Sequence, residues 1–301
     1  MNDRKKRGRR QVRPGRESRI GFSGGISYVL LLCLCLLIMV PILFTFLYSF
    51  FPRGEMEAYL KLRGNYDKSV WLDILYAPSQ VSLRQYYKIL IENPTYLKLF
   101  CNSAMYTGMI LLGQAAVIPL TAYALSRFIF RGRDTLFFLI LILMILPFQV
   151  TMAPSVIMLK WMGLLDTVWA VVLPSCFSPF YIFLLRQFMV TLPNELLEAG
   201  MVDGVGPIRG FVHVVLPVCR PILGAALALS FADNWNMVEQ PLVYLSGKPD
   251  LQPLSVMFNQ ISTDSADVAF AGAALYILPA LFVYMFFQED IVEGIQLSEL
   301  K

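Results

Sequence analysis

Six stretches of this sequence hold almost no charged side chain over about 20 residues or more, the length at which a helix crosses the hydrocarbon core of a bilayer. Backbone groups inside lipid must bond within their own segment, so such stretches are predicted to be helical. Only 15% of the residues are charged, whereas soluble domains carry about 25%. The predicted spans are 26–51, 99–126, 135–159, 167–186, 218–240 and 268–288. The fold class is therefore an all-α integral membrane protein with six transmembrane helices.

The basic tail formed by residues 1–25 predicts the orientation of the first span. It holds nine Lys or Arg side chains, and basic residues beside a first span remain in the cytoplasm. The short loop 127–134 falls on the same side and adds Arg127, Arg131 and Arg133. Six spans then return the C-terminal tail, residues 289–301, to the cytoplasm. The basic tail could also bind anionic lipid, but orientation alone accounts for it.

The remaining segments complete the predicted organisation. Residues 52–98 form an extracytoplasmic segment, in which 82–90 has the apolar spacing of a short amphipathic helix. Residues 99–288 form a core of five spans that includes a cytoplasmic loop, 187–217. Within this loop we expect a coupling helix between the fourth and fifth spans.

Few ionisable groups lie within the spans, and this disfavours several classes of function. Five of the six spans hold none away from their ends, whereas ion-coupled carriers and pumps place several at membrane depth. No Gly-x-x-x-x-Gly-Lys-Ser/Thr loop is present to bind ATP phosphates, and no nucleophile–base set indicates an enzyme. The five cysteines, beside a single histidine, lack the spacing of metal ligands. Energy for uphill transport would therefore have to come from another polypeptide.

The coupling segment, residues 194–204, is a polar interruption between two apolar stretches. Glu195 suits the positive end of a helix dipole, and Gly204 suits the left-handed position that ends a helix. A helix of about ten residues is unstable alone in water, so something must pack on it. Ala199 and Gly200 would let a partner approach the backbone closely, between the carboxylates of Glu198 and Asp203. A helix on the lipid surface, or a loop packed on its own bundle, remains the alternative.

The pattern Glu198-Ala199-Gly200-x-x-Asp203-Gly204, followed by Leu216-Pro217, closely resembles the Glu-Ala-Ala loop of permease subunits in bacterial binding-protein-dependent ABC importers. Further motifs are similar to the carbohydrate-uptake branch, and in particular to the smaller six-span permease of maltose-type systems: Asn102-Ser103, Ala122–Arg127, Leu146-Pro147, Arg220-Pro221 and Trp235-Asn236 with Pro241. The chain departs from the family at Gly200, usually Ala, and at Met237–Glu239, usually an acidic or amide residue and then an aromatic one. The second departure bears on the substrate.

This resemblance implies a machine of five parts in a bacterial inner (plasma) membrane. The partners would be a second related permease, two cytoplasmic ATPase subunits and an external sugar-binding protein, with ATP and Mg bound by the ATPases and no cofactor bound by this chain. The residues implied in coupling to the ATPase are Glu198, Ala199, Gly200, Asp203, Gly204, Leu216 and Pro217. The C-terminal tail could also reach the ATPases, or it could be solvated and idle.

A polar cluster occupies the outer half of the fifth predicted span: Asp233, Asn234, Trp235, Asn236 and Glu239. Ionisable groups at such depth face the bundle or a wet cavity. An indole beside carboxylates and amides suits a sugar, so the cluster is a candidate substrate pathway. It could equally be a polar cap that meets the binding protein, a neighbouring helix or the partner permease.

Two rival functions remain open at this point. A membrane receptor or scaffold could use the same cytoplasmic helix to hold a partner without transport. Within transport, relatives of this branch also import polyol phosphates, so a sugar is an expectation rather than a requirement of the sequence.

Overall fold

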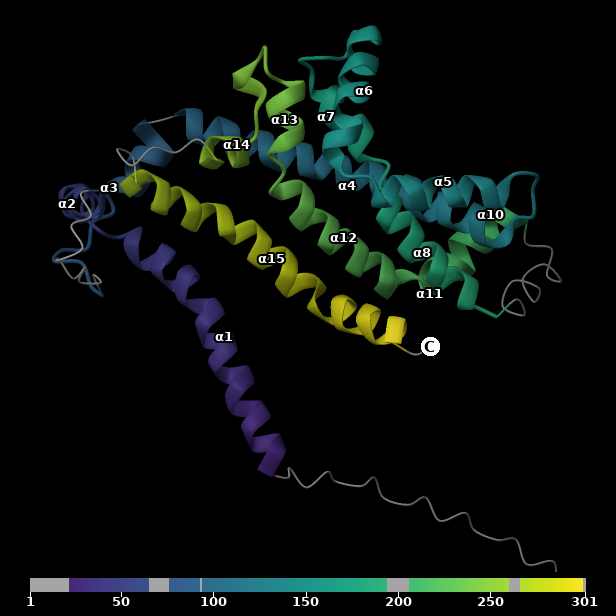
Figure 1. The fold of residues 1–301 in the computed structure, drawn as a ribbon, viewed down its shortest axis with the longest axis horizontal. Coiled ribbons are helices and arrows are strands. Elements are labelled where there is room, and N and C mark those ends of the chain that lie inside the picture. The colour runs from purple at the N-terminus through teal and green to yellow at the C-terminus, as the bar shows by residue number, and fades with distance from the viewer. Residues whose placement is uncertain (1–21, 65–75, 93, 194–205, 260–265, 300–301) are drawn as a thin grey trace, which may run out of the picture. The chain divides into compact units, whose positions relative to one another are not determined.

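A computed structural model describes residues 22–64, 76–92, 94–193, 206–259 and 266–299. All regular secondary structure in these ranges is helical (Figure 1), which confirms the predicted fold class. The chain divides into two units, residues 1–45 and 46–301. The first unit holds most of helix α1 (Phe22–Tyr48), whose side chains from Tyr28 to Leu43 are largely apolar and exposed, as expected of a helix that is solvated by lipid.

Four helical segments of the described residues are long and apolar enough to cross a membrane: Ser27–Tyr48, Pro94–Arg127, Val168–Thr191 and Val268–Gly294. Two bent helix pairs raise the number to six if each pair is one span. Each segment or pair overlaps one of the six predicted spans.

Helix α4 (Pro94–Arg127) occupies the centre of the second unit. It packs against α7 (Val168–Ser175), α8 (Pro179–Thr191) and α12 (Arg220–Trp235). Helix α12 also packs along α15 (Ala266–Glu299), as Figure 1 shows. Helix α12 therefore contacts one long helix from the early part of this unit, α4, and one from its last part, α15.

The α12–α15 contact is close because glycines lie in it. A Cβ atom on Gly224 would lie 2.6 Å from Oδ2 of Asp290, and one on Gly294 would lie 3.0 Å from Cβ of Ala225. Small residues let membrane helices approach closely, and this strengthens van der Waals packing where no hydrophobic effect drives association.

The segment before α4 contains the short helices α2 (Arg53–Gly64) and α3 (Arg84–Tyr87), and one π-turn, η1 (Lys88–Glu92). This confirms the prediction of a helix near residues 82–90. The buried amide of Gln85 donates to the carbonyl of Phe51, and the Tyr86 hydroxyl donates to Ser49 Oγ at 2.7 Å. These bonds tie the segment to the chain that follows α1.

The prediction that residues 135–159 form a single helix was wrong. The stretch consists of α5 (Arg133–Ile145) and α6 (Phe148–Trp161), which meet at 110°. Leu146 has an extended backbone, with ψ of 126°, because a following proline disfavours the helical conformation in the residue before it. Pro147 also has no N–H to continue the helical ladder. The Leu146-Pro147 motif is therefore the point at which this stretch turns.

The fifth predicted span, 218–240, was also wrong in its limits. Helix α12 ends at Trp235, and the short helix α13 (Glu239–Tyr244) follows. Pro241 lies in the first turn of α13, where a missing N–H costs nothing, whereas inside a continued α12 it would break the ladder. Glu239 and Asp233 are consequently on different helices.

The chain before α12 forms α10 (Pro207–Gly210), the π-turn η2 (Phe211–Val215) and α11 (Leu216–Val218). This stretch meets α12 at 75°. Helix α10 begins at Pro207, whose missing N–H costs nothing in a first turn. After α13, the chain continues through η3 (Pro249–Leu251) and α14 (Leu254–Asn259). Helices α6, α7 and α13 pack together and project to one side of α4 and α12 (Figure 1).

Candidate functional site

Most of the predicted coupling residues, Glu198, Ala199, Gly200, Asp203 and Gly204, lie outside the described residues. Their docking role therefore stays a prediction. Leu216 and Pro217 are described and form the start of α11. Leu216 packs against a buried cluster that includes Ile182, Phe211 and Ile222, whereas Pro217 is exposed.

The chain enters the coupling segment from the end of α8, and Arg127 of α4 holds that end. Its Nη2 donates to the carbonyl oxygens of Met189 and Leu192, each at 2.7 Å. The last carbonyls of a helix have no partner within the helix, and a cation is favoured beside them. Arg127 therefore satisfies and fixes the last turn of α8.

The chain leaves the coupling segment at Pro207, and Tyr123 of α4 contacts it there. The Tyr123 hydroxyl donates to the Pro207 carbonyl at 3.3 Å, and its ring packs on Phe211 with centroids 4.9 Å apart. Tyr123 and Arg127 are one helical turn apart, so a single turn of α4 contacts both ends of the segment. Sequence reasoning assigned these two residues no role in coupling, although a basic residue at a helix end beside a cytoplasmic loop was a usable signal.

Four helices meet in a chain of hydrogen bonds around Gln114, which is 2% exposed. The Gln114 amide donates to the Ser175 carbonyl at 2.7 Å, and its oxygen accepts from the fully buried Ser230 hydroxyl. Asn234 donates to Ser230 Oγ at 2.9 Å, and Ser175 Oγ donates to Gln240 at 3.0 Å. The network joins α4, α7, α12 and α13, and it fixes the amide of Asn234 within the bundle.

Asp233 lies beside this network and is exposed. It accepts a hydrogen bond of 2.6 Å from the hydroxyl of Tyr181, a residue of α8. A phenol that donates to one oxygen of a carboxylate leaves the other oxygen able to accept. The pair is therefore suited to bind hydroxyl groups.

Trp235 is 3% exposed and does not present its indole ring to a cavity. Tyr276 and Phe231 stack near it, with centroids 5.0 and 5.4 Å away, and Phe100 meets it edge-on at 5.6 Å. Its Nε1 donates to the Tyr276 carbonyl at 3.2 Å. The structure thus gives Trp235 a packing role between α4, α12 and α15.

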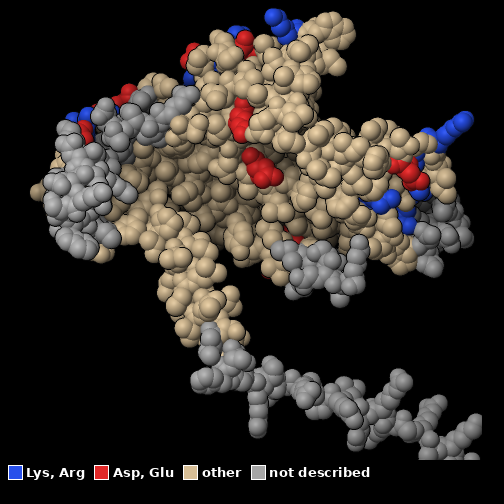
Figure 2. All heavy atoms as spheres, in the orientation of Figure 1, with Lys and Arg blue, Asp and Glu red and all other residues tan. Residues whose placement is uncertain are grey.

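Asn236 and Glu239 are both exposed. Asn236 donates to the Ala232 carbonyl at 3.0 Å, and Glu239 accepts from Gln149 of α6 at 3.1 Å. Figure 2 shows acidic atoms over α13 and the adjacent end of α12, and the surface around them is mostly uncharged. The predicted polar cluster thus separates into exposed groups, the half-buried Asn234 and the buried Trp235.

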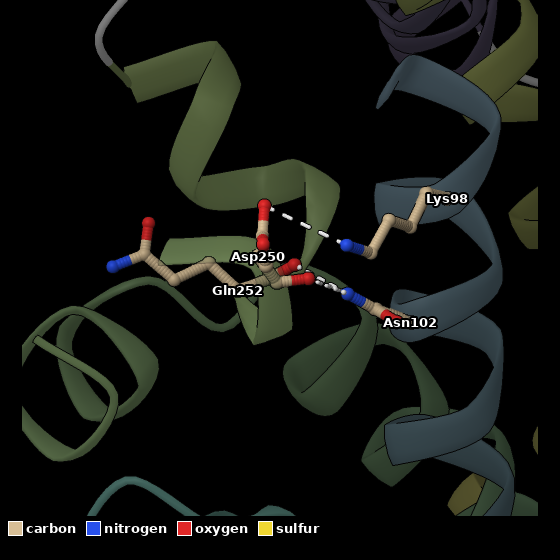
Figure 3. Close-up of polar contacts among 4 residues, drawn as sticks. All are labelled: Lys98, Asn102, Asp250 and Gln252. Carbon is tan, nitrogen blue, oxygen red and sulfur yellow. Dashed lines mark hydrogen bonds and ion pairs between the residues drawn. The ribbon is translucent and has the colours of Figure 1, made fainter. Parts of the chain in front are cut away.

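The other end of α4 holds the α13–α14 loop, residues 245–253 (Figure 3). The Asn102 amide donates to the carbonyls of Asp250 and Gln252 at 3.0 and 3.1 Å, and Lys98 pairs with Asp250 at 3.5 Å. Ser103 Oγ accepts from the Leu254 N–H at 2.9 Å, and the Tyr106 hydroxyl donates to the Leu251 carbonyl at 2.9 Å. Three turns of α4 thereby fix the backbone of this loop.

Comparison with known proteins identifies the family to which this bundle belongs. Residues 117–295 match the family described as binding-protein-dependent transport system inner membrane component. The chain belongs to this family. Membership confirms the predicted resemblance to importer permeases and shows that the inner membrane component is a transport protein embedded in a membrane.

Curated relatives of this inner membrane component cover most of its length. The arabinooligosaccharides transport system permease protein AraQ of Halalkalibacterium halodurans is 28% identical over 264 residues, covering 87% of this chain and 90% of AraQ. The sn-glycerol-3-phosphate transport system permease protein UgpE of Yersinia pestis is 33% identical over 202 residues, covering 66% of this chain and 72% of UgpE. Both are named as transport system permeases.

The fold is shared with a solved importer. One chain in the crystal structure of a bacterial ABC transporter involved in the import of the acidic polysaccharide alginate aligns with a TM-score of 0.74. The alignment covers 92% of this chain and 99% of the other, at 22% identity. At that identity the likeness concerns the fold.

Proposed function

We propose that this inner membrane component is the permease subunit through which an ATP-driven importer takes up a sugar or oligosaccharide. An external binding protein delivers the solute, and the bundle alternates between outward-open and inward-open states. Separate ATPase subunits bind ATP and Mg, and a second, related permease completes the pore. Both termini and the coupling segment lie in the cytoplasm, whereas residues 52–98 lie outside. The observation that carries the proposal is the family match over residues 117–295.

The geometry at the ends of the coupling segment supports energy transfer from another polypeptide. The family depends on a binding protein for transport, and no phosphate-binding loop occurs in the sequence. Arg127 and Tyr123 attach both flanks of the coupling segment to the central helix of the bundle. A force applied by an ATPase to this segment would therefore act directly on α4.

The exposed carboxylates favour a neutral sugar over a phosphate ester as the solute. Asp233 and Glu239 are exposed, and the sequence of α12 beyond Arg220 and of α13 holds no Lys or Arg. Phosphate sites in proteins recruit Arg or Lys, and carboxylates repel a phosphate dianion. The exposed Asp233 instead offers its second carboxylate oxygen to sugar hydroxyls, while the buried Tyr181 holds the first. AraQ, named for arabinooligosaccharide transport, accords with this choice.

Purification of the tagged chain from its native membrane in mild detergent tests the proposal. We expect a second permease and an ATPase to co-purify, and ATP hydrolysis to rise when a sugar-loaded binding protein is added. Isolation of this chain alone, without ATPase activity, would contradict the proposal that it is a subunit of an importer. Stimulation by a binding protein loaded with glycerol phosphate, and not by any loaded with sugars, would contradict the choice of solute.

A further inference from the structure

Helix α4 contacts two distant parts of the molecule through their backbones. At one end, Arg127 and Tyr123 bond to the carbonyls of Met189, Leu192 and Pro207, which flank the coupling segment. At the other end, Asn102 bonds to the carbonyls of Asp250 and Gln252 in the α13–α14 loop (Figure 3). Backbone bonds constrain the path of a segment more directly than contacts between side-chain tips.

These two ends belong to one uninterrupted helix. Asn102 and Arg127 lie about 38 Å apart along it, at 1.5 Å per residue. Pro119 lies inside α4, but the helix continues through it to Arg127. Midway, buried Gln114 bonds to Ser175 of α7 and Ser230 of α12. The helix is therefore one continuous element that is supported along its length.

We propose that α4 transmits movement between the coupling segment and the α13–α14 loop, with Arg127 and Tyr123 as positioning residues at one end and Asn102 at the other. This inference rests on the proposed function, since the movement is driven by the partner ATPase. In the proposed orientation, the loop lies on the side where the binding protein delivers solute. Nucleotide binding in the cytoplasm would then alter the α13–α14 loop through α4 itself.

The test follows the α13–α14 loop with a chemical label. The five native cysteines are replaced, and Lys248, an exposed residue of this loop, is changed to cysteine. The purified complex is placed in lipid nanodiscs, where a maleimide reagent reaches both faces. The labelling rate at position 248 is measured without nucleotide and with ATP plus vanadate, and ATP hydrolysis is measured on the same samples.

The background protein is the chain without native cysteines that carries Lys248→Cys. We expect ATP plus vanadate to change its labelling rate at least threefold. The same chain with Arg127→Met added should change less than 1.5-fold. ATP hydrolysis is recorded for every variant, so that a lost labelling response in a complex that still hydrolyses ATP is assigned to transmission. Arg131→Met is the matched control: it removes an exposed arginine from the loop that follows α4 and should retain the full response. Tyr123→Phe, which deletes one hydroxyl, should weaken the response, and Asn102→Leu should abolish it from the other end.

An Arg127→Met variant with the full nucleotide response would overturn the proposal. A background protein that hydrolyses ATP and imports solute, but whose position 248 never responds, would overturn it as well. Absence of any ATPase from the purified complex would instead overturn the proposed function, and the transmission with it. Gel filtration of every variant shows whether the complex is still folded and assembled, so that a lost labelling response is not mistaken for unfolding. Tyr123→Phe is the substitution least able to disturb folding.

Discussion

Replacement of Trp235 by alanine distinguishes packing from sugar binding. Three rings surround the indole at centroid distances of 5.0 to 5.6 Å, and such pairs contribute about 0.5–1.5 kcal/mol each. Inside a membrane the burial of apolar surface adds little, since lipid is as apolar as the core. The three lost ring contacts and the lost bond to the Tyr276 carbonyl therefore sum to about 2–6 kcal/mol.

For a chain of 301 residues, this loss should lower the midpoint of thermal unfolding by roughly 3–10 °C. The midpoint is measured by gel filtration with fluorescence detection after heating in detergent. Trp161→Ala serves as control because Trp161 is 83% exposed, and its midpoint should hardly move. Equal midpoints for the two variants would refute the packing role.

The same reasoning predicts the transport kinetics of a milder variant. Trp235→Phe keeps an aromatic ring between Tyr276 and Phe231, so the KM for uptake should change by less than about twofold, or 0.4 kcal/mol. If instead KM rose tenfold while the thermal midpoint stayed unchanged, the ring would be contacting substrate. Trp235 would then have to leave its buried position during transport.

Three further predictions concern other parts of the chain. Glu198→Lys, and separately Gly204→Leu, should abolish uptake while the amount of protein in the membrane stays normal; retained uptake would remove the coupling role of these residues. A cysteine at Ser79, which is exposed, in a background without native cysteines should react with an impermeant thiol reagent in intact cells, and labelling only after lysis would reverse the topology. Gln114→Leu and Ser230→Ala should be coupled by about 0.6–1.7 kcal/mol in a double-mutant cycle of unfolding, the range for hydrogen bonds between membrane helices; strictly additive effects would show that their bond contributes nothing.

Much of the helical framework could be predicted because membrane helices follow from length and the absence of charge. The limits of individual helices could not, since they depend on single prolines within apolar stretches. Pro147 ends one helix and Pro41 does not, and hydropathy treats the two alike. Each outcome depends on whether neighbouring groups can donate hydrogen bonds to the backbone carbonyls that the proline leaves without a partner.

The candidate site was predicted less completely. The sequence grouped Asp233, Trp235 and Glu239 on one helix, but the structure separates them by burial and by the end of α12. Asn102 was noted only as part of a family motif, and Arg127 only as part of a motif and as a basic residue of the loop 127–134. Their contacts join residues 62 and 148 positions apart in the sequence, and no local pattern encodes a partner at such a separation.

The separation between Asn102 and the α13–α14 loop also has a consequence for synthesis of the chain. At about 5–20 residues per second, the ribosome needs roughly 7–30 s to reach the loop after making Asn102. During this interval Asn102 and Ser103 of a newly inserted α4 lack their final acceptors and donors, as Gln114 lacks Ser230. The nascent helix therefore passes through a stage in which these polar groups lack their final partners within the chain. A chain truncated before residue 250 would leave Asn102 and Ser103 permanently without these partners, although Gln114 would still have Ser175 and Ser230.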